Sequence, residues 1–436
     1  MNGRPDPTDA GLSRRSLFRR AGAAALATGA AGTLAACENT TTPVAAGGTT
    51  GGGPGILGDP SAGGSVDSAG IPLARKDYPV VLPRLQDPVK SSVKPERGGE
   101  LHIYNYADYL NPAVLKQFGK QEGVVVKVTT FETLDEAFSK LSTGLPADVI
   151  FTTPDQLGRL VGRKLVQPLN YELLPNLERN IWPELHSPCY DVGPRYSVPY
   201  VTYTTGIGWR NDKLDFDPSK LDQPWDAFWN ATKYAGRVAV LDDGRETPGM
   251  AMMRRGVTDL NTESPELLDR AAADLQDLSK ATHVKVSISD YETLPAGRIW
   301  LHESWSGDLI SAVLSYLPKG TKPDVLSYWY QAEGGPVFND CITVSSKAAK
   351  PVLAHRFLNF ILDPKVAYAN FAGYVGYQPP QNSISPTVLF DRGIVPKTLD
   401  RVVVTREAYA TGNAYLALTA KGDQLWNQCW SRFRNG

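Results

Sequence analysis

The sequence is poor in cysteine and histidine, and it has no excess charge of either sign. Besides Cys37 there are three cysteines, whose spacing fits no metal site and whose odd number leaves at least one free thiol. The five histidines are scattered and include no HxxxH or HExxH pair. With a net charge of −1, nucleic acid and anionic membrane surfaces are not expected partners. We therefore expect a monomer without a metal or other cofactor. The remaining cysteines are Cys189, Cys341 and Cys429, and the histidines are His102, His186, His283, His302 and His355.

Two export motifs stand in order within the first 37 residues. "SRRSLFRR" (13–20) contains the Arg14–Arg15 pair of a twin-arginine signal and is followed by an apolar, Ala-rich run. This run is too short and too often interrupted by glycine to span a bilayer permanently. It ends in "LAAC" (34–37), the lipobox of bacterial lipoproteins, so Cys37 would become the lipidated first residue. We expect an exported protein whose only membrane contact is this lipid, on the outer face of the cell membrane.

Three kinds of segment follow the export signal. Residues 38 to about 70 are rich in Gly, Thr, Ser and Ala and should form a flexible tether. Residues 71–97 carry spaced prolines with Leu, Val and Tyr, which favours an extended strap along the folded body. About 340 residues remain from residue 98 onward, more than one core comfortably holds, so we expect two lobes.

Strands and helices are predicted to alternate after residue 98. "LHIYNY" (101–106) reads as a buried strand, and Asn111 followed by Pro112 predicts a capped helix start. "VVVKVTTF" (124–131) and "ADVIFTT" (147–153) are the next predicted strands, each followed by a helical pattern. This βαβαβ order predicts an α/β fold, a parallel sheet with helices on both faces and ligands bound beyond the carboxyl ends of the strands.

A second βα series begins near residue 207. "YSVPYVTYTTGIGWR" (196–210) and "GGPVFNDCITVSS" (334–346) are long β-rich runs suited to crossing between two lobes. Two lobes joined by two crossings make a hinged cleft. We assign residues 98–206 and about 341–400 to the first lobe, and residues 207–340 and about 401–436 to the second.

Acidic residues recur at predicted strand ends and turns in both lobes, accompanied by aromatic ones. Asp243 and Asp308 precede helices and could alternatively be N-caps, and Trp305 or Phe338 alone could be core. A protonated amine offers only donors, so it needs carboxylates as acceptors, while aromatic faces attract the cation. Taken together, the set describes a receptor for a molecule with two or more ammonium groups. The acids are Asp108, Asp155, Asp243, Glu246, Asp308 and Asp340, and the aromatic residues are Tyr106, Tyr109, Trp305, Phe338 and Tyr377.

Six ordered motifs carry a resemblance over the whole body of the chain. "YNYADYLNP", "SVPYVTYTTGIGW", "LDDGRE", "WSGD", "EGGPVFND" and "GYQPP" resemble those of the spermidine/putrescine-binding proteins of ABC importers. The resemblance implies the type II periplasmic-binding-protein fold, capture of a polyamine between the lobes, and an ABC permease as partner. It assigns ligand contacts to the aromatic residues and to the acids named above other than Asp155, with Asp108 near the ligand. It adds Thr153, which stands where the family uses a serine.

Two departures from the family pattern bear on the ligand. Tyr106 stands where the family usually has tryptophan, and Asp155 stands where an aromatic residue is common. The WxGD element favours putrescine-type members, whereas the extra acid at Asp155 favours a longer or more highly charged ligand.

Other functions fit parts of the pattern. Asp243 and Glu246 with a partner acid could suggest a glycosidase, but no activated nucleophile is visible, and "ESWSG" lacks the first glycine of GxSxG. A binding protein for a sugar, an amino-acid derivative or ferric ion is the other alternative. The surplus of carboxylates over Arg and Lys at the strand ends favours the polyamine, and we predict no enzyme activity.

Overall fold

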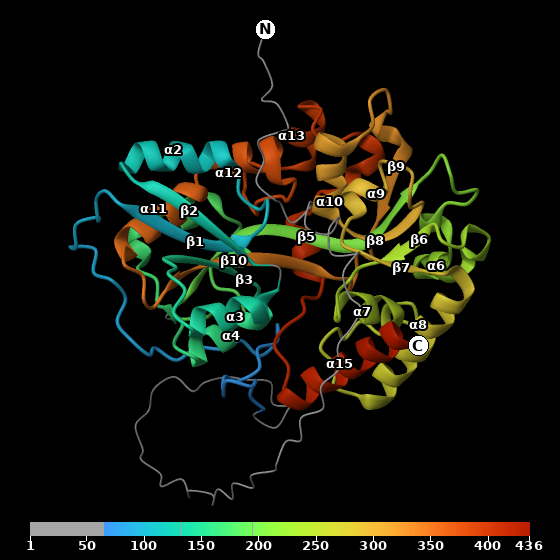
Figure 1. Cartoon of the computed structure of the whole chain (residues 1–436), viewed down its shortest axis with the longest axis horizontal. Coiled ribbons are helices and arrows are strands. Elements are labelled where there is room, and N and C mark those ends of the chain that lie inside the picture. The colour runs from blue at the N-terminus through green and yellow to red at the C-terminus, as the bar shows by residue number, and fades with distance from the viewer. Residues whose placement is uncertain (1–64, 132, 194) are drawn as a thin grey trace, which may run out of the picture. The chain divides into compact units, whose positions relative to one another are not determined.

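Ten strands of the described chain form one mixed sheet (Figure 1). The computed structural model describes residues 65–131, 133–193 and 195–436, all within the compact unit Leu57–Gly436. Arg14, Arg15, Cys37 and most of the predicted tether therefore lie outside the described residues. No helix in the described ranges has the length and apolar composition for a membrane span.

The order of the strands explains how the two lobes are joined. In the first lobe β1 pairs in parallel with β2 and β3, and in the second β6 pairs in parallel with β7 and β8. The long antiparallel strands β5 and β10 lie between these groups. The strands are β1 Glu100–Tyr106, β2 Val125–Phe131, β3 Val149–Thr152, β4 Val166–Gln167, β5 Ser197–Arg210, β6 Val238–Val240, β7 Lys285–Val286, β8 Leu301–Trp305, β9 Leu326–Trp329 and β10 Val337–Ser345.

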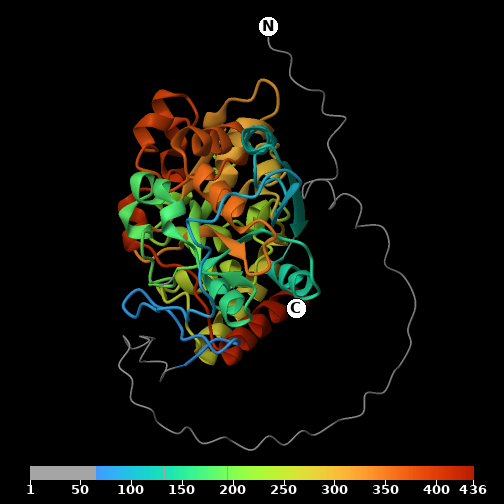
Figure 2. The ribbon, with the colours of Figure 1, turned by 90° about the vertical axis from the view of Figure 1, so that its left-hand side faces the viewer.

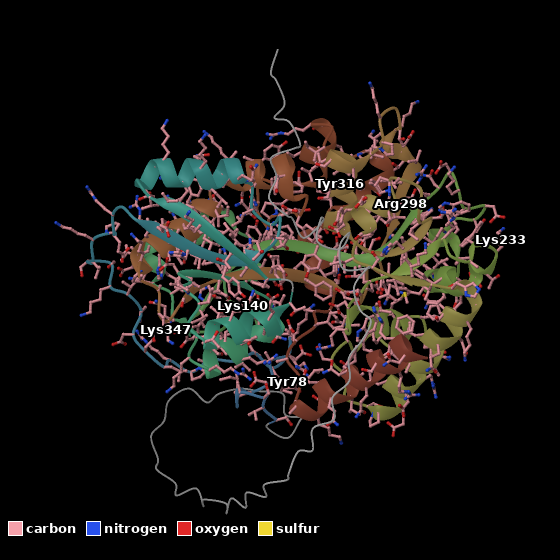
Figure 3. The ribbon with its side chains drawn as sticks, in the orientation of Figure 1. Tyr78, Lys140, Lys233, Arg298, Tyr316 and Lys347 are labelled. Carbon is pink, nitrogen blue, oxygen red and sulfur yellow. The ribbon has the colours of Figure 1, made fainter. Side chains whose placement is uncertain are left out.

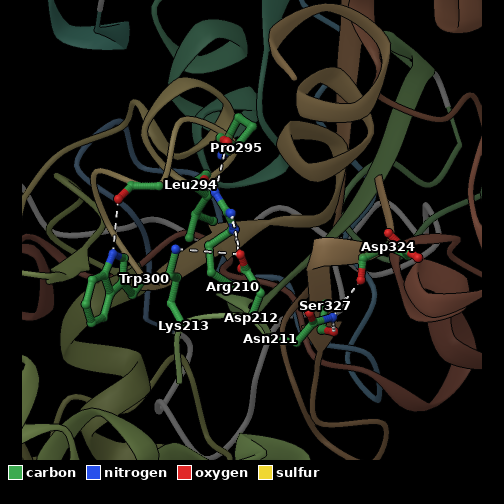
Figure 4. A network of polar contacts seen from close by, with 10 residues as sticks. Arg210, Asn211, Asp212, Lys213, Leu294, Pro295, Trp300, Asp324 and Ser327 are labelled. Carbon is green, nitrogen blue, oxygen red and sulfur yellow. Dashed lines mark hydrogen bonds and ion pairs between the residues drawn. The ribbon is translucent and has the colours of Figure 1, made fainter. Parts of the chain in front are cut away.

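β5 is the strand that passes from one lobe to the other. Its first part pairs with β10, and its last part, from Thr205 onward, pairs with β8 and β9. At its end the Arg210 guanidinium donates to Asp212 at 2.7 Å and to the Pro295 carbonyl at 3.0 Å (Figure 4). The two predicted crossing runs are thus central strands. The residue boundaries assigned to the lobes remain a prediction.

The helices cover both faces of the sheet, as the pattern predicted (Figure 1). Along β1, Leu101 and Ile103 point into one core and Tyr104 into the core on the opposite face. The α-helices are α2 Pro112–Glu122, α3 Leu134–Ser142, α4 Pro154–Gly162, α5 Pro175–Asn180, α6 Ala227–Asn230, α7 Glu246–Met253, α8 Pro265–Thr282, α9 Asp290–Thr293, α10 Ser306–Ser311, α11 Pro351–Ile361, α12 Pro364–Asn370, α13 Pro386–Asp391, α14 Arg406–Thr411 and α15 Ala420–Asn435.

Local sequence signals set several helix ends. The Asn111 side chain accepts a hydrogen bond from the Ala113 amide at 2.9 Å, and Pro112 occupies the first helical position of α2, as predicted. Gly123 ends this helix with a φ of 68°, which a residue without a Cβ adopts readily. Thr133 caps α3 by accepting a hydrogen bond from the Glu136 amide at 3.2 Å.

Residues 71–83, the first part of the predicted strap, contribute to a core of the first lobe (blue in Figures 1 and 2). Val80 and Leu82 are buried, and Val80 exchanges backbone hydrogen bonds with Cys189 and Val192. Tyr78 in the same segment is exposed (Figure 3). Because apolar burial is the main favourable term in folding, the strap should stabilise this lobe.

Truncating a buried strap residue tests that contribution. Leu82 is 2% exposed. The substitution Leu82→Ala should lower the free energy of unfolding by about 2–5 kcal/mol, because it leaves a cavity in the core. Leu85→Ala is the matched control, since Leu85 is 43% exposed and should change stability by less than about 0.5 kcal/mol. Chemical denaturation measures both, and equal stabilities for the two variants would show that the strap adds nothing to the fold.

Candidate functional site

Asp340 is the carboxylate on which two phenol groups converge. It is 5% exposed and lies where the register of β10 against β5 shifts between Asp340 and Cys341. Such irregularities re-aim a side chain, and they recur next to functional sites. Tyr109 donates its hydroxyl to Oδ2 at 2.8 Å, and Tyr203 donates to Oδ1 at 3.3 Å. Burial and the neighbouring Asp340 charge raise the pKa of both phenols well above the usual range.

Aromatic rings surround this carboxylate. The Tyr377 ring centroid lies 5.5 Å from that of Tyr109 and 5.4 Å from that of Tyr203. On either side, Tyr106 lies 5.7 Å from Tyr109 and Phe338 lies 5.3 Å from Tyr203. The predicted residues Tyr106, Tyr109, Phe338, Asp340 and Tyr377 are therefore brought together.

Tyr200 and Tyr203 belong to this group, although the sequence analysis did not single them out. Tyr200 donates its hydroxyl to the Tyr109 carbonyl, and its ring centroid lies 5.3 Å from that of Tyr109. These two contacts hold the backbone and the ring of Tyr109 in the turn after β1. The signal available in the sequence was their position within the long crossing run, which had to pass between the lobes.

The turn after β1 has a conformation that few residues tolerate. Asp108 has a φ of 56°, in the left-handed region, where a short polar side chain costs less than a bulky one. Its Oδ1 accepts a hydrogen bond from the Tyr374 hydroxyl at 2.9 Å. This contact holds the turn that carries Tyr109.

The second lobe contributes a separate acidic group at the start of α7. Trp305, at the end of β8, donates its Nε1–H to Glu246 Oε1 at 2.9 Å. Asp243 Oδ1 accepts from the backbone amides of Arg245 and Glu246 at 2.8 and 3.0 Å, the capping role considered as its alternative. Burial, followed by the Asp243 charge, raises the pKa of Glu246 well above its usual range.

Glu303 is a further buried acid in this group, and the sequence analysis missed it. It is fully buried on β8, where Oε2 accepts from the Leu241 amide at 3.1 Å and from the Thr247 hydroxyl at 2.6 Å. Burial raises the pKa of Glu303 to about 8, so the carboxyl is largely neutral at pH 7. The signal that could have revealed it was a glutamate two residues before Trp305, in the run that leads into the WSGD motif.

Asp308 is buried in the first turn of α10, next to the fully buried Asp290 of α9. Burial, followed by Asp308, raises the pKa of Asp290 well above its usual range, so this carboxyl pair retains a proton. In the same turn, a Cβ on Gly307 would lie 2.5 Å from the Tyr377 ring. The glycine of the WxGD element therefore lets Tyr377 pack directly on the α10 turn.

Thr153 and Asp155 lie at the start of α4 in the first lobe. Thr153 Oγ1 is buried and has no hydrogen-bond partner among the described residues. Asp155 accepts from the Gln156 side chain at 2.7 Å. Its charge helps to raise the pKa of Asp243 after burial, the main cause, and it favours the charged form of Arg245. Asp155 therefore lies close enough to the acidic group of the second lobe to interact with it electrostatically.

Comparison with known proteins gives a consistent result. Residues 113–393 match the family described as bacterial extracellular solute-binding protein. The spermidine/putrescine-binding periplasmic protein of Escherichia coli is 26% identical over 312 residues, which cover 70% of this chain and 86% of that protein. The putrescine/agmatine-binding protein of Pseudomonas aeruginosa is 26% identical over 356 residues, covering 77% and 92% of the two chains.

Solved structures show the same fold. The spermidine/putrescine ABC transporter substrate-binding protein of Streptococcus pneumoniae has a TM-score of 0.63 at 22% identity, covering 77% of this chain and 99% of that one. This likeness confirms the predicted two-lobed type II fold. Because the family match covers more than half of the chain, the protein belongs to the bacterial extracellular solute-binding protein family.

Proposed function

We propose that this protein captures a polyamine of the putrescine/spermidine class between its lobes and delivers it to an ABC importer. The observation that carries the proposal is the group around Asp340, a buried carboxylate bonded by two phenols and bordered by further aromatic rings. An ammonium group needs such an acceptor, and the rings attract its charge while they cover the adjoining methylenes.

Two separate acidic groups favour a ligand with more than one cation. Tyr203 is close enough to both groups for Asp340 and Glu246 to add to the rise that burial causes in its pKa. A molecule that spans from Asp340 past this ring to Glu246 would place one ammonium at each acid. The proposed ligand contacts are Tyr106, Asp108, Tyr109, Thr153, Asp155, Asp243, Glu246, Trp305, Asp308, Phe338, Asp340 and Tyr377.

The names of similar proteins support this ligand class. Relatives that cover 70% and 77% of this chain are called spermidine/putrescine-binding and putrescine/agmatine-binding proteins. Structures of the same fold have also been solved as a GABA receptor and in complex with glucopine, at 14% and 13% identity. The fold alone therefore does not determine which ligand is bound. The acidic and aromatic side chains of the site determine the ligand specificity.

Titration of the wild-type protein and Asp340→Asn tests the function. Wild type should bind putrescine or spermidine, and Asp340→Asn should weaken binding by roughly tens- to thousands-fold, because the bound ammonium loses its buried carboxylate. Calorimetry measures the affinities, and a thermal-shift screen with sugars, amino acids and metal ions tests the other solutes. Asp217→Asn is the matched control, since exposed Asp217 caps a short helix and Asn also caps. Binding of a sugar or an iron salt instead of any polyamine would refute the proposal.

Asp155 should influence which polyamine is preferred. If its charge faces an additional amine, Asp155→Asn will weaken spermidine or spermine binding more than putrescine binding, since only the longer ligands carry that amine. Calorimetric titration of the variant with the three amines measures the order of affinity. An unchanged order would remove Asp155 from the ligand contacts.

We further propose a lipid anchor at Cys37 and export through the twin-arginine route. A similar structure, 21% identical with a TM-score of 0.63, is a lipoprotein of Treponema pallidum. Cys37→Ala should release exported protein from the membrane fraction, because the lipid is the only membrane-directed feature that the sequence predicts for the mature chain. Cell fractionation measures this, with Cys189→Ala as control. A Cys37→Ala protein that stays membrane-bound after export would contradict the anchor.

A further inference from the structure

Several polar atoms in and beside the second lobe are buried without a hydrogen-bond partner in the described part of the chain, Arg245 Nε among them. Four of these atoms are oxygens near the acidic group at the start of α7: Glu246 Oε2, Glu303 Oε1, Thr205 Oγ1 and Tyr415 Oη. Thr205 and Glu303 are fully buried, and Glu246 and Tyr415 are 5% and 8% exposed. A buried polar atom without a hydrogen bond is costly, so it calls for a water, an ion or a ligand group as its partner.

The strand register brings two of these groups to one face of the sheet. Thr205 on β5 is paired directly with Trp305 on β8, and Glu303 lies two residues before Trp305 on the same strand. Side chains two residues apart on a strand point to the same face, and directly paired residues share that face. Trp305 donates to Glu246, so the acid of α7 lies above the same face.

Tyr415, in the chain segment before α15, lies near Glu246 and Glu303. A Cβ on Gly249 of α7 would lie 2.0 Å from its hydroxyl, and Gly249 is three residues after Glu246, on the same side of the helix. Its ring stacks on Phe338, with centroids 5.2 Å apart, which connects it to the aromatic group around Asp340. Burial, followed by Glu246, raises the pKa of the Tyr415 phenol, and Glu303 contributes to the same rise.

The two carboxyl oxygens of Glu303 differ in their hydrogen bonding. Oε2 accepts from the Leu241 amide and the Thr247 hydroxyl, which fixes the carboxyl and leaves Oε1 without a donor. The Arg245 guanidinium lies over the Tyr415 ring, with its carbon 4.9 Å from the ring centroid, and its Nη2 donates to the Leu260 carbonyl and to the Asn261 side chain.

We propose that Glu303, Glu246, Thr205 and Tyr415 form an inner receptor for a primary ammonium group, which is one end of the ligand. A primary ammonium has three N–H donors. Glu246 interacts with both Thr205 and Glu303, and Tyr415 interacts with both acids, so the four side chains lie close enough to supply three acceptors together. The inference rests on the proposed function and adds Glu303 as a residue that determines ligand specificity. An end capped by an acetyl group has no charge to match the acids, so this receptor selects free amine ends.

Glu303→Gln tests the inner receptor, with Glu263→Gln as a matched control. Glu263 also holds a backbone amide and a threonine hydroxyl, both of Thr419, but it is not among the acids grouped around Glu246. Calorimetric titration with spermidine should show binding weakened by about 10- to 100-fold in Glu303→Gln and by no more than about threefold in Glu263→Gln, since a hydrogen bond to a charged group contributes about 1.5–3 kcal/mol.

Tyr415→Phe and Thr205→Val provide a second test that does not depend on the folding of Glu303→Gln. Each removes one hydroxyl and keeps the shape, and each should weaken spermidine binding several-fold. If wild type binds spermidine and Glu303→Gln binds it as well as Glu263→Gln does, or if both hydroxyl variants match wild type, the inner receptor is wrong. If wild type binds no polyamine, the proposed function itself fails.

Discussion

The site depends on the position of one carboxylate, Asp340, at the irregularity where β10 lies against β5. This strand pair is the central connection between the two lobes, so its register also determines which side chains face the space between them. Tyr109 reaches Asp340 from the turn after β1, and Tyr203 reaches it from β5 itself. The register shift leaves Tyr200 without a paired residue in β10, and Tyr200 donates its hydroxyl to the Tyr109 carbonyl.

The acids of the second lobe are arranged differently from Asp340. Burial, followed among the neighbouring charges by that of Asp243, raises the pKa of both Glu246 and Glu303, which favours their protonated forms in the absence of a cation. A bound ammonium would favour the ionised forms of the two acids. The second lobe would therefore hold these buried negative charges only while ligand is bound. The Asp290–Asp308 pair follows the same physical rule on the opposite face of the sheet.

Local elements were predictable because their signals are local. The Asn111 cap, the prolines at first helical positions and the alternating strand pattern depend on neighbours in sequence, and they gave α2, β1 and the crossing strand β5 correctly. The aromatic residues around Asp340 were also predicted to share one site, but the predicted strand-end position of Asp340 was wrong, because Phe338 and Asp340 lie within the antiparallel strand β10.

Other features of the site depend on contacts between distant residues. Nothing in the pattern of β5 indicates that Tyr200 bonds the Tyr109 carbonyl or that Tyr203 bonds Asp340. Likewise, Asp290 and Glu303 acquire their raised pKa values from burial and from acids on other elements. Asp108 also accepts a hydrogen bond from Tyr374, a contact that strand-end position alone does not reveal.

A crystal structure of the mature protein grown with spermidine tests the central claim most directly. The account predicts a terminal ammonium nitrogen within about 3 Å of an Asp340 carboxylate oxygen, with the methylene chain running past Tyr203 towards Glu246. A ligand bound elsewhere, or bound between the lobes with no nitrogen at Asp340, would contradict it.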